Sequence, residues 1–255
     1  MVQALQRANP TLTAGGQAIL DRVEAVRDRK RSDPARPSIT LAYAQSLDGC
    51  IAADHGLPTA ISNCETLVVT HHLRAMHDAL LVGVNTVIVD DPRLTVRLAP
   101  GSNPTPVIVD SSLRLPLDAK LLRQDSRPLV MTTGGSFTSR RSALEEKGAD
   151  VVSVAAHPDG GVDLADLFAK LGSRGIRSVF VEGGAKIITS ILAAGLADQV
   201  VLTIAPKFLG GVRSVEPLFG RGPNRQPVLT DIACEKFGDD LVVQGELVSS
   251  ANGPK

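Results

Sequence analysis

The sequence predicts an α/β protein with a mainly parallel central sheet, helices on both faces and an antiparallel C-terminal strand. The first observation is that short apolar and β-branched runs alternate with helical stretches from Ser38 onward. Strands that alternate with helices of about ten residues pair in parallel through right-handed crossovers. The second observation is that no helical pattern lies between Lys207 and Asp240. We therefore expect the strands on either side of that segment to pair antiparallel at one side of the sheet.

Residues 11–30 predict a leading helix, because apolar residues recur near helical spacing at Leu12, Ile19, Val23 and Val26. The helix is expected to end before Pro34 and to pack on the main domain or on a second subunit. The chain then divides into an N-terminal helical extension, residues 1–36, and a single domain, residues 37–250. No internal repeat or low-complexity linker interrupts that domain.

The strands are predicted, in chain order, at 39–44, 79–82, 107–109, 129–132, 151–154, 178–181, 200–204 and 241–248. Such short apolar runs are typical of strands that are buried on both faces of a parallel sheet. Open sheets of this class bind ligands at the carboxyl ends of their strands. The turns that follow the strands are therefore where we expect chemistry.

The composition excludes several classes of protein. Lys plus Arg and Asp plus Glu are 27 each, Trp is absent and there is one Tyr, which leaves neither a global field nor stacking platforms for nucleic acid. The cysteines, Cys50, Cys64 and Cys234, are far apart and are expected to be free thiols in a reducing compartment. No apolar run approaches the ~18 residues that cross a bilayer. We expect a cytoplasmic protein without nucleic-acid or membrane partners.

Three histidines fall in one predicted helical stretch, but the spacing of His71, His72 and His77 does not match the i, i+4 pair of helical metal ligands. The His-x-Glu and Pro-Cys-x-x-Cys signature of zinc deaminases is absent. The Gly-x-Ser-x-Gly elbow, the Walker loop and the Gly-x-Gly-x-x-Gly fingerprint are absent as well. We expect no metal site, and a serine hydrolase, a P-loop NTPase or an ordinary Rossmann enzyme loses support.

The most informative stretch is 181–186, in which a β-branched run ends in Glu182, Gly183 and Gly184 before an apolar helical pattern. Two glycines let the backbone approach a ligand closely, and unpaired N–H groups at a helix start favour a pyrophosphate. A Gly-Gly turn between strand and helix is structural at least as often as it is functional. The stretch gains weight from the motifs around it.

The segment 78–97 brings a buried strand, a glycine turn, a short helix and an Asp-Asp-Pro turn close together. Arg93, Arg97 and the earlier Arg74 carry guanidinium groups that can hold a phosphate bidentately. Asp90 can accept hydrogen bonds from sugar hydroxyls or amino groups. Each of these residues alone is more often a solvated surface charge.

Three further strand ends carry turn residues. Asp48 and Gly49 follow the first strand, 110–112 follows the third and 132–136 follows the fourth. Small polar residues cap turns as readily as they contact a nucleotide, so both interpretations stay open. If it is functional, the last of these turns suits the outer half of a dinucleotide.

In their order and spacing these motifs resemble the pyrimidine reductases of riboflavin biosynthesis, a family with stand-alone members and members fused to a deaminase. The resemblance spans about residues 37–247. Each motif is weak alone, but the set is highly specific. The motifs are SLDG at 46–49, LRA at 73–75, LVG at 81–83, TV at 86–87, DDPRLTVR at 90–97, VDS at 109–111, VEGG at 181–184 and IAPKFLGG at 204–211.

The resemblance implies a dihydrofolate-reductase-like fold and an NADPH-dependent oxidoreductase. The expected reaction reduces the ribosyl group of a ribosylaminopyrimidine 5′-phosphate to the ribitylamino product, with hydride transfer to C1′ of the ribose. The resemblance also implies a homodimer, for which the apolar run 187–196 or the N-terminal helix could form the interface.

Particular residues acquire expected roles from the same resemblance. Cofactor contacts are expected at Ala44, Thr86, Asp90, Ser111, Gly183, Gly184, Ala185, Lys186, Ile187, Ile188, Thr189 and Ser190. Substrate contacts are expected at Arg74, Leu94, Arg97 and Glu182. Arginines suit a 5′-phosphate, and a carboxylate suits a hydroxyl or amino donor. Since the cofactor supplies the reducing chemistry, Asp90 is the one candidate for moving a proton.

The chain departs from the bacterial bifunctional pattern at two positions. Ala42 stands where many such domains have a lysine, and Ala60 stands where many have a tryptophan. Stand-alone reductases also lack both residues, so activity is still expected, while the form of the substrate, amino or deaminated, stays open. Two alternatives remain: a related reductase of another pterin or pyrimidine, such as dihydrofolate, and a catalytically silent NADPH-binding paralogue.

Overall fold

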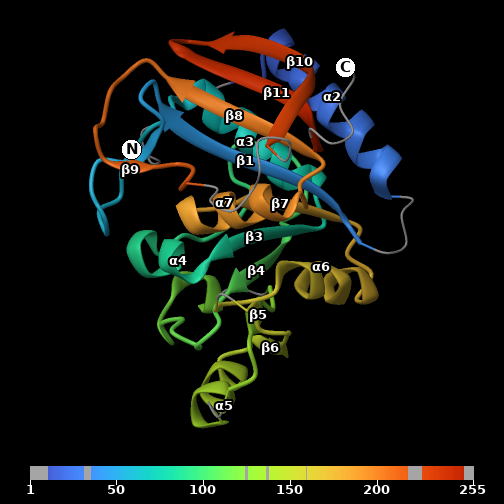
Figure 1. The fold of residues 1–255 in the computed structure, drawn as a ribbon, viewed down its shortest axis with the longest axis vertical. Coiled ribbons are helices and arrows are strands. Elements are labelled where there is room, and N and C mark those ends of the chain that lie inside the picture. Colours follow the sequence, from blue (N-terminus) through green and yellow to red (C-terminus); the bar gives the residue numbers. More distant parts are fainter. Residues whose placement is uncertain are drawn as a thin grey trace.

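The computed structural model describes residues 11–31, 36–123, 126–135, 138–158, 160–217 and 226–249. A nine-stranded sheet runs through the molecule in the order β10-β11-β8-β1-β7-β3-β4-β5-β6. Figure 1 shows this sheet from the red β10 and β11 at the top to β5 and β6 below, with helices on both sides. In the described part of the chain, no helix is both long and apolar enough to cross a membrane.

The strands from β8 to β6 in this order are parallel, which confirms the predicted sheet. Their bounds are β1 Ser38–Ser46, β3 Ala79–Gly83, β4 Thr105–Val109, β5 Leu129–Thr132, β6 Asp150–Ser153, β7 Ser178–Glu182 and β8 Gln199–Ala205. Side chains alternate between the two faces, so Leu41 and Ala42 of β1 join different core clusters. Burial on both faces is why these strands read as continuous apolar runs.

The C-terminal strands finish the sheet antiparallel. β11, Asp240–Ser249, pairs with β8, which confirms the predicted antiparallel finish. β10, Pro227–Phe237, adds an edge strand that the sequence analysis did not predict. A bulge lies between Thr230 and Ala233, where Asp231 has a φ of 48°. A bulge breaks the period of two on which recognition of a strand depends.

Helices cover both faces of the sheet (Figure 1). Their bounds are α2 Ala14–Arg31, α3 Cys64–Met76, α4 Val84–Asp90, the 3-10 helix η1 Lys120–Arg123, α5 Thr138–Glu146, α6 Leu164–Ser173 and α7 Ala185–Ala194. Ile19 of α2 and Leu73 of α3 join the core on one face, whereas Phe168 of α6 and Ile191 of α7 join the core on the other. A separate two-stranded ribbon pairs β2, Cys50–Ala52, with β9, Val212–Arg213.

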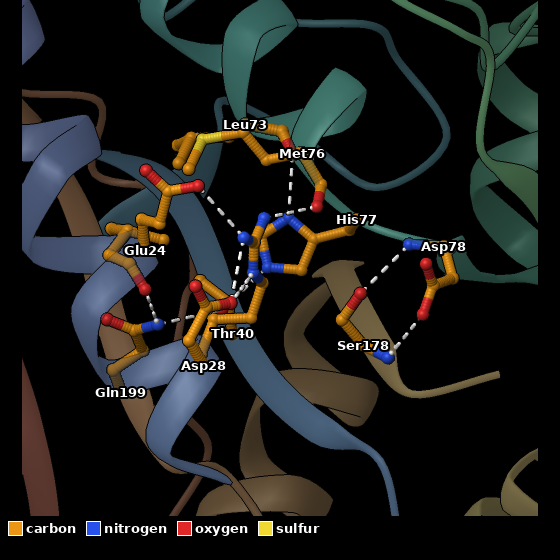
Figure 2. Close-up of polar contacts among 11 residues, drawn as sticks. Glu24, Asp28, Thr40, Leu73, Met76, His77, Asp78, Ser178 and Gln199 are labelled. Carbon is orange, nitrogen blue, oxygen red and sulfur yellow. Dashed lines mark hydrogen bonds and ion pairs between the residues drawn. The ribbon is translucent and has the colours of Figure 1, made fainter. Parts of the chain in front are cut away.

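The helix predicted at 11–30 is α2, and buried polar contacts join it to the sheet (Figure 2). The side-chain amide of Gln199 donates to the carbonyl of Val23 at 3.0 Å and to Thr40 Oγ1 at 3.1 Å. His77, which follows α3, contacts the same hydroxyl through Nε2 at 2.9 Å. The helix is therefore tied into the core at a point that β1 and β8 share.

Candidate active site

A cleft of about 640 Å³ opens at the carboxyl edge of the sheet. Residues of β1, β8, α3 and α4, the turn after β7 and the segment 51–62 line it. Open parallel sheets place their ligands at this edge, and small-molecule sites usually measure roughly 300–1,000 Å³. The cleft is therefore in the expected place and has room for a substrate beside part of a cofactor.

Small and apolar side chains form the base of the cleft. Ala42 and Ala44 lie on β1, Val201 on β8 and Val242 on β11, and Leu73 of α3 adjoins them. Such a surface leaves room for a planar ring and keeps water away from it. The alanines of β1 thus contribute to the shape of the site.

Three polar residues of α3 line the cleft at helical spacing. Thr66, Thr70 and Arg74 are four residues apart, which puts them on one face of the helix. The helix begins at a firm cap, because Asn63 Oδ1 accepts the N–H of Thr66 at 3.0 Å. Asp240 Oδ2 in turn accepts the N–H of Asn63 at 2.7 Å. These contacts fix the direction in which α3 carries Arg74 into the cleft.

Arg74 and Glu182 form a two-pronged ion pair. Arg74 Nε and Nη2 each lie 2.6 Å from a carboxylate oxygen of Glu182, and Nη1 donates to the carbonyl of Thr95 at 3.1 Å. Burial by itself lowers the pKa of Arg74, but the charge and hydrogen bonds of Glu182 more than offset it, so the pKa is raised. The structure thus brings the two predicted substrate contacts together as partners of each other.

Arg97 adds a further guanidinium beside this pair. Its Nη1 donates to Thr95 Oγ1 at 2.9 Å. Burial, and then the charges of Arg74 and Arg93, lower the pKa of Arg97. Arg97 does not itself line the cleft, whereas Arg74 does. Positive charges gathered beside a site attract an anion, and guanidinium groups bind phosphate bidentately.

His71 is buried next to the backbone of Arg97. It is 3% exposed, and its Nδ1 accepts the backbone N–H of Arg97 at 3.0 Å. Burial, followed by the charges of Arg74 and Arg97, lowers the pKa of His71 to about 3. His71 is therefore neutral near pH 7, with its proton on Nε2. No group of three or more His, Cys, Asp or Glu side chains within the described ranges is arranged to hold a metal.

Asp90 ends α4 at the cleft. Three other residues of this helix, Asn85, Thr86 and Val89, also line the cleft. Partial loss of hydration raises the pKa of Asp90, so this carboxyl holds a proton more readily than an ordinary aspartate. The next residue, Asp91, is the C-cap of the helix and has a φ of 41°. Its carboxylate accepts the N–H of Lys120 at 2.8 Å. Asp91 therefore stabilises a turn, while Asp90 faces the site.

The turn at Gly183 and Gly184 leads from β7 into α7. Gly184 is the N-cap of α7, and no side chain caps the first turn. A Cβ added to Gly183 would lie 2.7 Å from Ile187 Cγ2, whereas one added to Gly184 would meet Thr86 Oγ1 at 4.0 Å. The first glycine is therefore required by close packing, and the second leaves open space in the cleft. An uncapped helix start with this space fits the pyrophosphate of a dinucleotide.

The segment 51–62 forms one wall of the cleft. The turn between β1 and β2, which precedes this wall, is held to the loop after β8 by hydrogen bonds. Asp48 accepts the N–H of Leu209 at 3.1 Å and that of Gly210 at 2.7 Å, and the hydroxyl of Ser46 also donates to it. These hydrogen bonds, that of Ser46 first, hold the pKa of Asp48 well below its ordinary value. Asp48 thus joins two loops through its carboxylate.

The cleft gathers residues from both predicted groups. Its lining includes Ala44, Thr86, Asp90, Gly183 and Gly184 from the cofactor contacts, and Arg74 and Glu182 from the substrate contacts. Leu94 is instead 3% exposed, with a φ of 54°. Ser111 lies at the turn after β4, where its carbonyl accepts the hydroxyls of Thr132 and Thr133.

The predicted cofactor contacts in α7 and the turn before it do not all lie at the cleft. Ile188 is buried in the core, and Ile187 packs partly against it. Thr189 Oγ1 accepts the N–H of Glu216 at 2.8 Å, and Lys186 and Ser190 are exposed. The part of the predicted run that lines the cleft is therefore the glycine turn, Gly183 and Gly184.

Apart from Ala60, sequence reasoning missed the wall 51–62, and it also missed the hydroxyl groups of Thr66, Thr70 and Thr203. For the two threonines of α3 a signal was present, since both lie at helical spacing from Arg74. The wall carries no such signal, because its glycine, proline and aspartate are ordinary turn residues.

Fold and cleft together define a mainly parallel α/β protein with a nucleotide-sized site at the carboxyl edge of its sheet. Residues 37–243 match the family model described as the RibD C-terminal domain. The chain belongs to this family.

Two relatives illustrate the match. The 2,5-diamino-6-ribosylamino-4(3H)-pyrimidinone 5′-phosphate reductase of Methanothermobacter thermautotrophicus is 37% identical over 215 residues, which cover 82% of this chain and 97% of that protein. The riboflavin biosynthesis protein RibD of Aquifex aeolicus is 38% identical over 209 residues, which cover 82% of this chain and 57% of that protein. The chain thus spans little more than half of the RibD relative and nearly all of the reductase.

Solved structures agree with the sequence match. The riboflavin biosynthesis reductase Rib7 of Saccharomyces cerevisiae superposes with a TM-score of 0.67 at 31% identity, over 85% of this chain and 92% of that one. RibD of Acinetobacter baumannii superposes with a TM-score of 0.70 at 25% identity, over 84% of this chain and 58% of that one. The dihydrofolate-reductase-like fold that the resemblance implied is confirmed.

Proposed function

We propose that this chain is an NADPH-dependent oxidoreductase of riboflavin biosynthesis. It would reduce the ribosyl group of a ribosylamino-(di)aminopyrimidine 5′-phosphate to the ribitylamino 5′-phosphate. The observation that carries this proposal is a single cleft that holds both an uncapped, glycine-lined helix start and the Arg74–Glu182 pair. Relatives named as reductases of such a pyrimidine phosphate support it.

NADPH, when bound, supplies a hydride from its nicotinamide ring. The chain has to hold that ring against the ribose C1′ and exclude water, since orientation is the main contribution a protein makes to such a step. The short side chains of Ala42 and Ala44 leave room against β1 for a planar ring. The glycine turn before α7 and Thr86 would hold the phosphates beside it.

We assign the substrate phosphate to Arg97 and Arg74. Glu182 already accepts from Arg74 through both oxygens, yet each carboxylate oxygen has a second lone pair. It can therefore accept a hydroxyl or amino donor of the substrate without releasing Arg74. In this proposal the ion pair is a preassembled recognition unit, and little side-chain ordering is left for the moment of binding.

The reduction also consumes a proton. Hydride addition to C1′ of the ring-opened imine breaks the C=N π bond and leaves the electron pair on nitrogen, which takes up a proton to give the ribitylamine. We assign the delivery of this proton to Asp90, because it lines the cleft and because partial loss of hydration raises its pKa, so that it holds a proton more readily than an ordinary aspartate.

The deciding assay follows the absorbance of NADPH when the ribosylaminopyrimidine 5′-phosphate is added in its amino or deaminated form. Oxidation with one form supports the proposal and identifies the substrate. Faster turnover of dihydrofolate, used as the comparison, would favour a related reductase. Tight NADPH binding without oxidation by either pyrimidine would favour a silent paralogue.

We propose in addition a cytoplasmic homodimer in which residues 1–36 are an extension of the reductase domain, 37–250. The apolar residues Ile188 and Ile191 of α7 pack into the core of the chain itself, so they do not serve an interface. Leu47 and Phe208, which are 55% and 77% exposed, offer apolar surface instead. Sedimentation equilibrium distinguishes a monomer from a dimer.

A further inference from the structure

The N-terminal helix α2 lies outside the residues that the family model matches, which begin at residue 37. It nevertheless packs against elements that build the cleft, because it contacts both α3 and β1. Ile19 and Val23 of α2 are fully buried in the same hydrophobic cluster as Leu73 of α3 and Ala42 of β1. Leu73 and Ala42 also line the cleft. The helix is therefore part of the support beneath the site.

One buried side chain of α2 reaches the end of α3. Arg27 Nη1 donates to the carbonyl of Met76, the last residue of α3, at 2.6 Å, and the side chain of Arg27 is 8% exposed. Acidic residues of α2 hold the other two nitrogens, since Nη2 donates to Glu24 at 3.0 Å and Nε donates to Asp28 at 2.9 Å. Dashed lines in Figure 2 join Glu24, Asp28 and Met76 to this guanidinium. Its orientation toward α3 is thus fixed from within α2.

The last turn of α3 requires donors from outside the helix. The final carbonyls of a helix have no N–H partner within it, and a positive charge is favourable at that end. Besides Arg27, the residue that follows the helix contributes here. The N–H of His77 donates to the carbonyl of Arg74 at 3.4 Å, and His77 Nδ1 contacts the carbonyl of Leu73 at 2.7 Å. Arg27 is therefore the donor that α2 supplies to this turn.

Arg74 lies in the same turn, so its position depends on these contacts. It donates to both carboxylate oxygens of Glu182 at 2.6 Å and to the carbonyl of Thr95 at 3.1 Å. A pair with two parallel hydrogen bonds is geometrically specific and tolerates little displacement. Without Arg27 the carbonyl of Met76 loses this donor, and helix ends fray. Fraying of this turn would move Arg74 relative to Glu182.

We propose that Arg27 is a positioning residue that holds Arg74 in place for the phosphate of the substrate. The inference rests on the proposed function, which assigns that phosphate to Arg97 and Arg74. The helix α2 is then a working part of the pyrimidine site. Its effect is on the pyrimidine and not on NADPH, because the predicted cofactor contacts that line the cleft lie on β1, on α4 and in the turn after β7.

The kinetic test replaces Arg27 with Met, which keeps an apolar stem and removes the donors and the charge. We expect KM for the pyrimidine phosphate to rise about 3- to 10-fold, the range of one hydrogen bond, while KM for NADPH changes by less than about twofold. Arg27→Lys keeps one charged donor and should restore most of the pyrimidine affinity. If Arg27→Met does not fold, Arg27→Gln takes its place with the same expected split between the two KM values.

Arg22→Met is the matched control on the same helix. Arg22 Nε donates to Gln244 Oε1 at 2.8 Å, and Nη2 lies 2.9 Å from Asp231 Oδ2. Arg22 therefore ties α2 to β11 and β10 instead of α3. This variant loosens the helix on its other side, and both KM values should stay unchanged. An equal loss of pyrimidine affinity in Arg22→Met would contradict a specific role for Arg27.

A double-mutant cycle tests the same link without catalysis. Glu182 lies on β7, whereas the partners of Arg27 lie on α2 and α3, so without transmission through α3 the two changes should add. We expect the unfolding equilibrium constant of Arg27→Met combined with Glu182→Gln to depart about threefold or more from the product of the single effects. Arg22→Met combined with Glu182→Gln should match the product within about twofold. Urea denaturation measures both cycles.

The inference is overturned if the cycle with Arg27 is additive, or if KM rises equally for the pyrimidine and for NADPH in Arg27→Met. Coupling in a protein that reduces neither pyrimidine would support the link from Arg27 to the Arg74–Glu182 pair while the proposed function fails. Reduction of a pyrimidine with an unchanged KM in Arg27→Met would leave the reaction standing and contradict the inference. Thermal unfolding of each variant verifies that folded protein is measured.

Discussion

The effect of replacing a charged residue in the site depends on whether its charge is paired with that of a neighbour. The side chains of Arg74 and Glu182 are 13% and 21% exposed, so water compensates little for the loss of either partner. Removing one member of a buried pair leaves an uncompensated charge, which costs more than the pair contributes over an apolar substitute. The pair is therefore expected to matter for folding as well as for recognition.

Replacing Glu182 with Gln keeps the shape of the side chain and removes its charge. Arg74 loses its counter-ion, so we expect the free energy of unfolding to fall by about 1–3 kcal/mol. We also expect KM to rise more for the pyrimidine than for NADPH. Equilibrium denaturation and steady-state kinetics measure these two effects.

Glu246→Gln provides the comparison for that variant. It removes the ion pair between Glu246, whose side chain is 23% exposed, and Arg29, whose side chain is 60% exposed. Because water reaches Arg29, this pair is expected to be worth under about 1 kcal/mol. Equal losses of stability in the two variants would contradict the importance given to burial of the Arg74–Glu182 pair.

His71 gives stability a dependence on pH. Its pKa is 6.5 when unperturbed and about 3 in the folded protein. Between these values the unfolded chain binds a proton that the folded protein does not, so stability falls as the pH falls, by up to about 1.4 kcal/mol per pH unit. Chemical denaturation between about pH 7 and pH 5 measures this slope above the range in which carboxylates titrate.

His71→Gln removes the titrating ring and keeps an oxygen that can accept the N–H of Arg97. The slope of stability against pH should therefore be flatter in this variant. If both proteins show the same slope, His71 is not its source.

At the scale of elements, the close contact between β7 and α7 shapes the start of the phosphate cradle. A methyl group at Gly183 would lie 2.7 Å from Ile187 Cγ2, so Gly183→Ala has to displace α7. Overpacking of this kind costs about 1–3 kcal/mol, and we expect NADPH affinity to fall about tenfold if a similar amount is lost from binding. Thermal unfolding and a cofactor titration measure both losses.

Gly172→Ala is a fair control for that change. A Cβ at Gly172, in α6, would meet its nearest neighbour, Pro37 Cδ, at 3.6 Å, which is an ordinary contact. This variant should keep full NADPH affinity and unfold at or above the original temperature, because alanine loses less backbone entropy than glycine. An equal loss of affinity in the two alanine variants would contradict a specific role for the β7–α7 turn.

Elements differ in how well the sequence predicts them, and the reasons are physical. β3 and β7 are buried on both faces, and such strands read as apolar runs. β10 is an edge strand with a bulge at Asp231, so its alternation loses phase. The wall 51–62 owes its place to contacts with a loop much later in the chain, and no local pattern reports such contacts.

At the scale of the whole molecule, the site is assembled from distant segments. Sequence motifs indicated Arg74 and Glu182 as members of one site, but the two residues are 108 positions apart. Their pairing depends on the parallel order of β1, β7 and β3 in the sheet, so it could be observed only in three dimensions.

The central strand β1 lies between β7 and β8, and both of these strands come from the C-terminal half of the chain. Ser38, for example, pairs with Ser178, so β1 cannot complete its pairing until that half has folded. Parallel pairings over such separations form slowly, because the entropy of closing the loop is lost before the contacts are gained. Helices can appear earlier, yet the cleft has no base until β1 and β8 are in place. In stopped-flow refolding, nucleotide binding should therefore lag behind the helical signal, and simultaneous recovery would contradict this order. A partly folded chain would then have no activity, and activity would appear only when the last strands have paired.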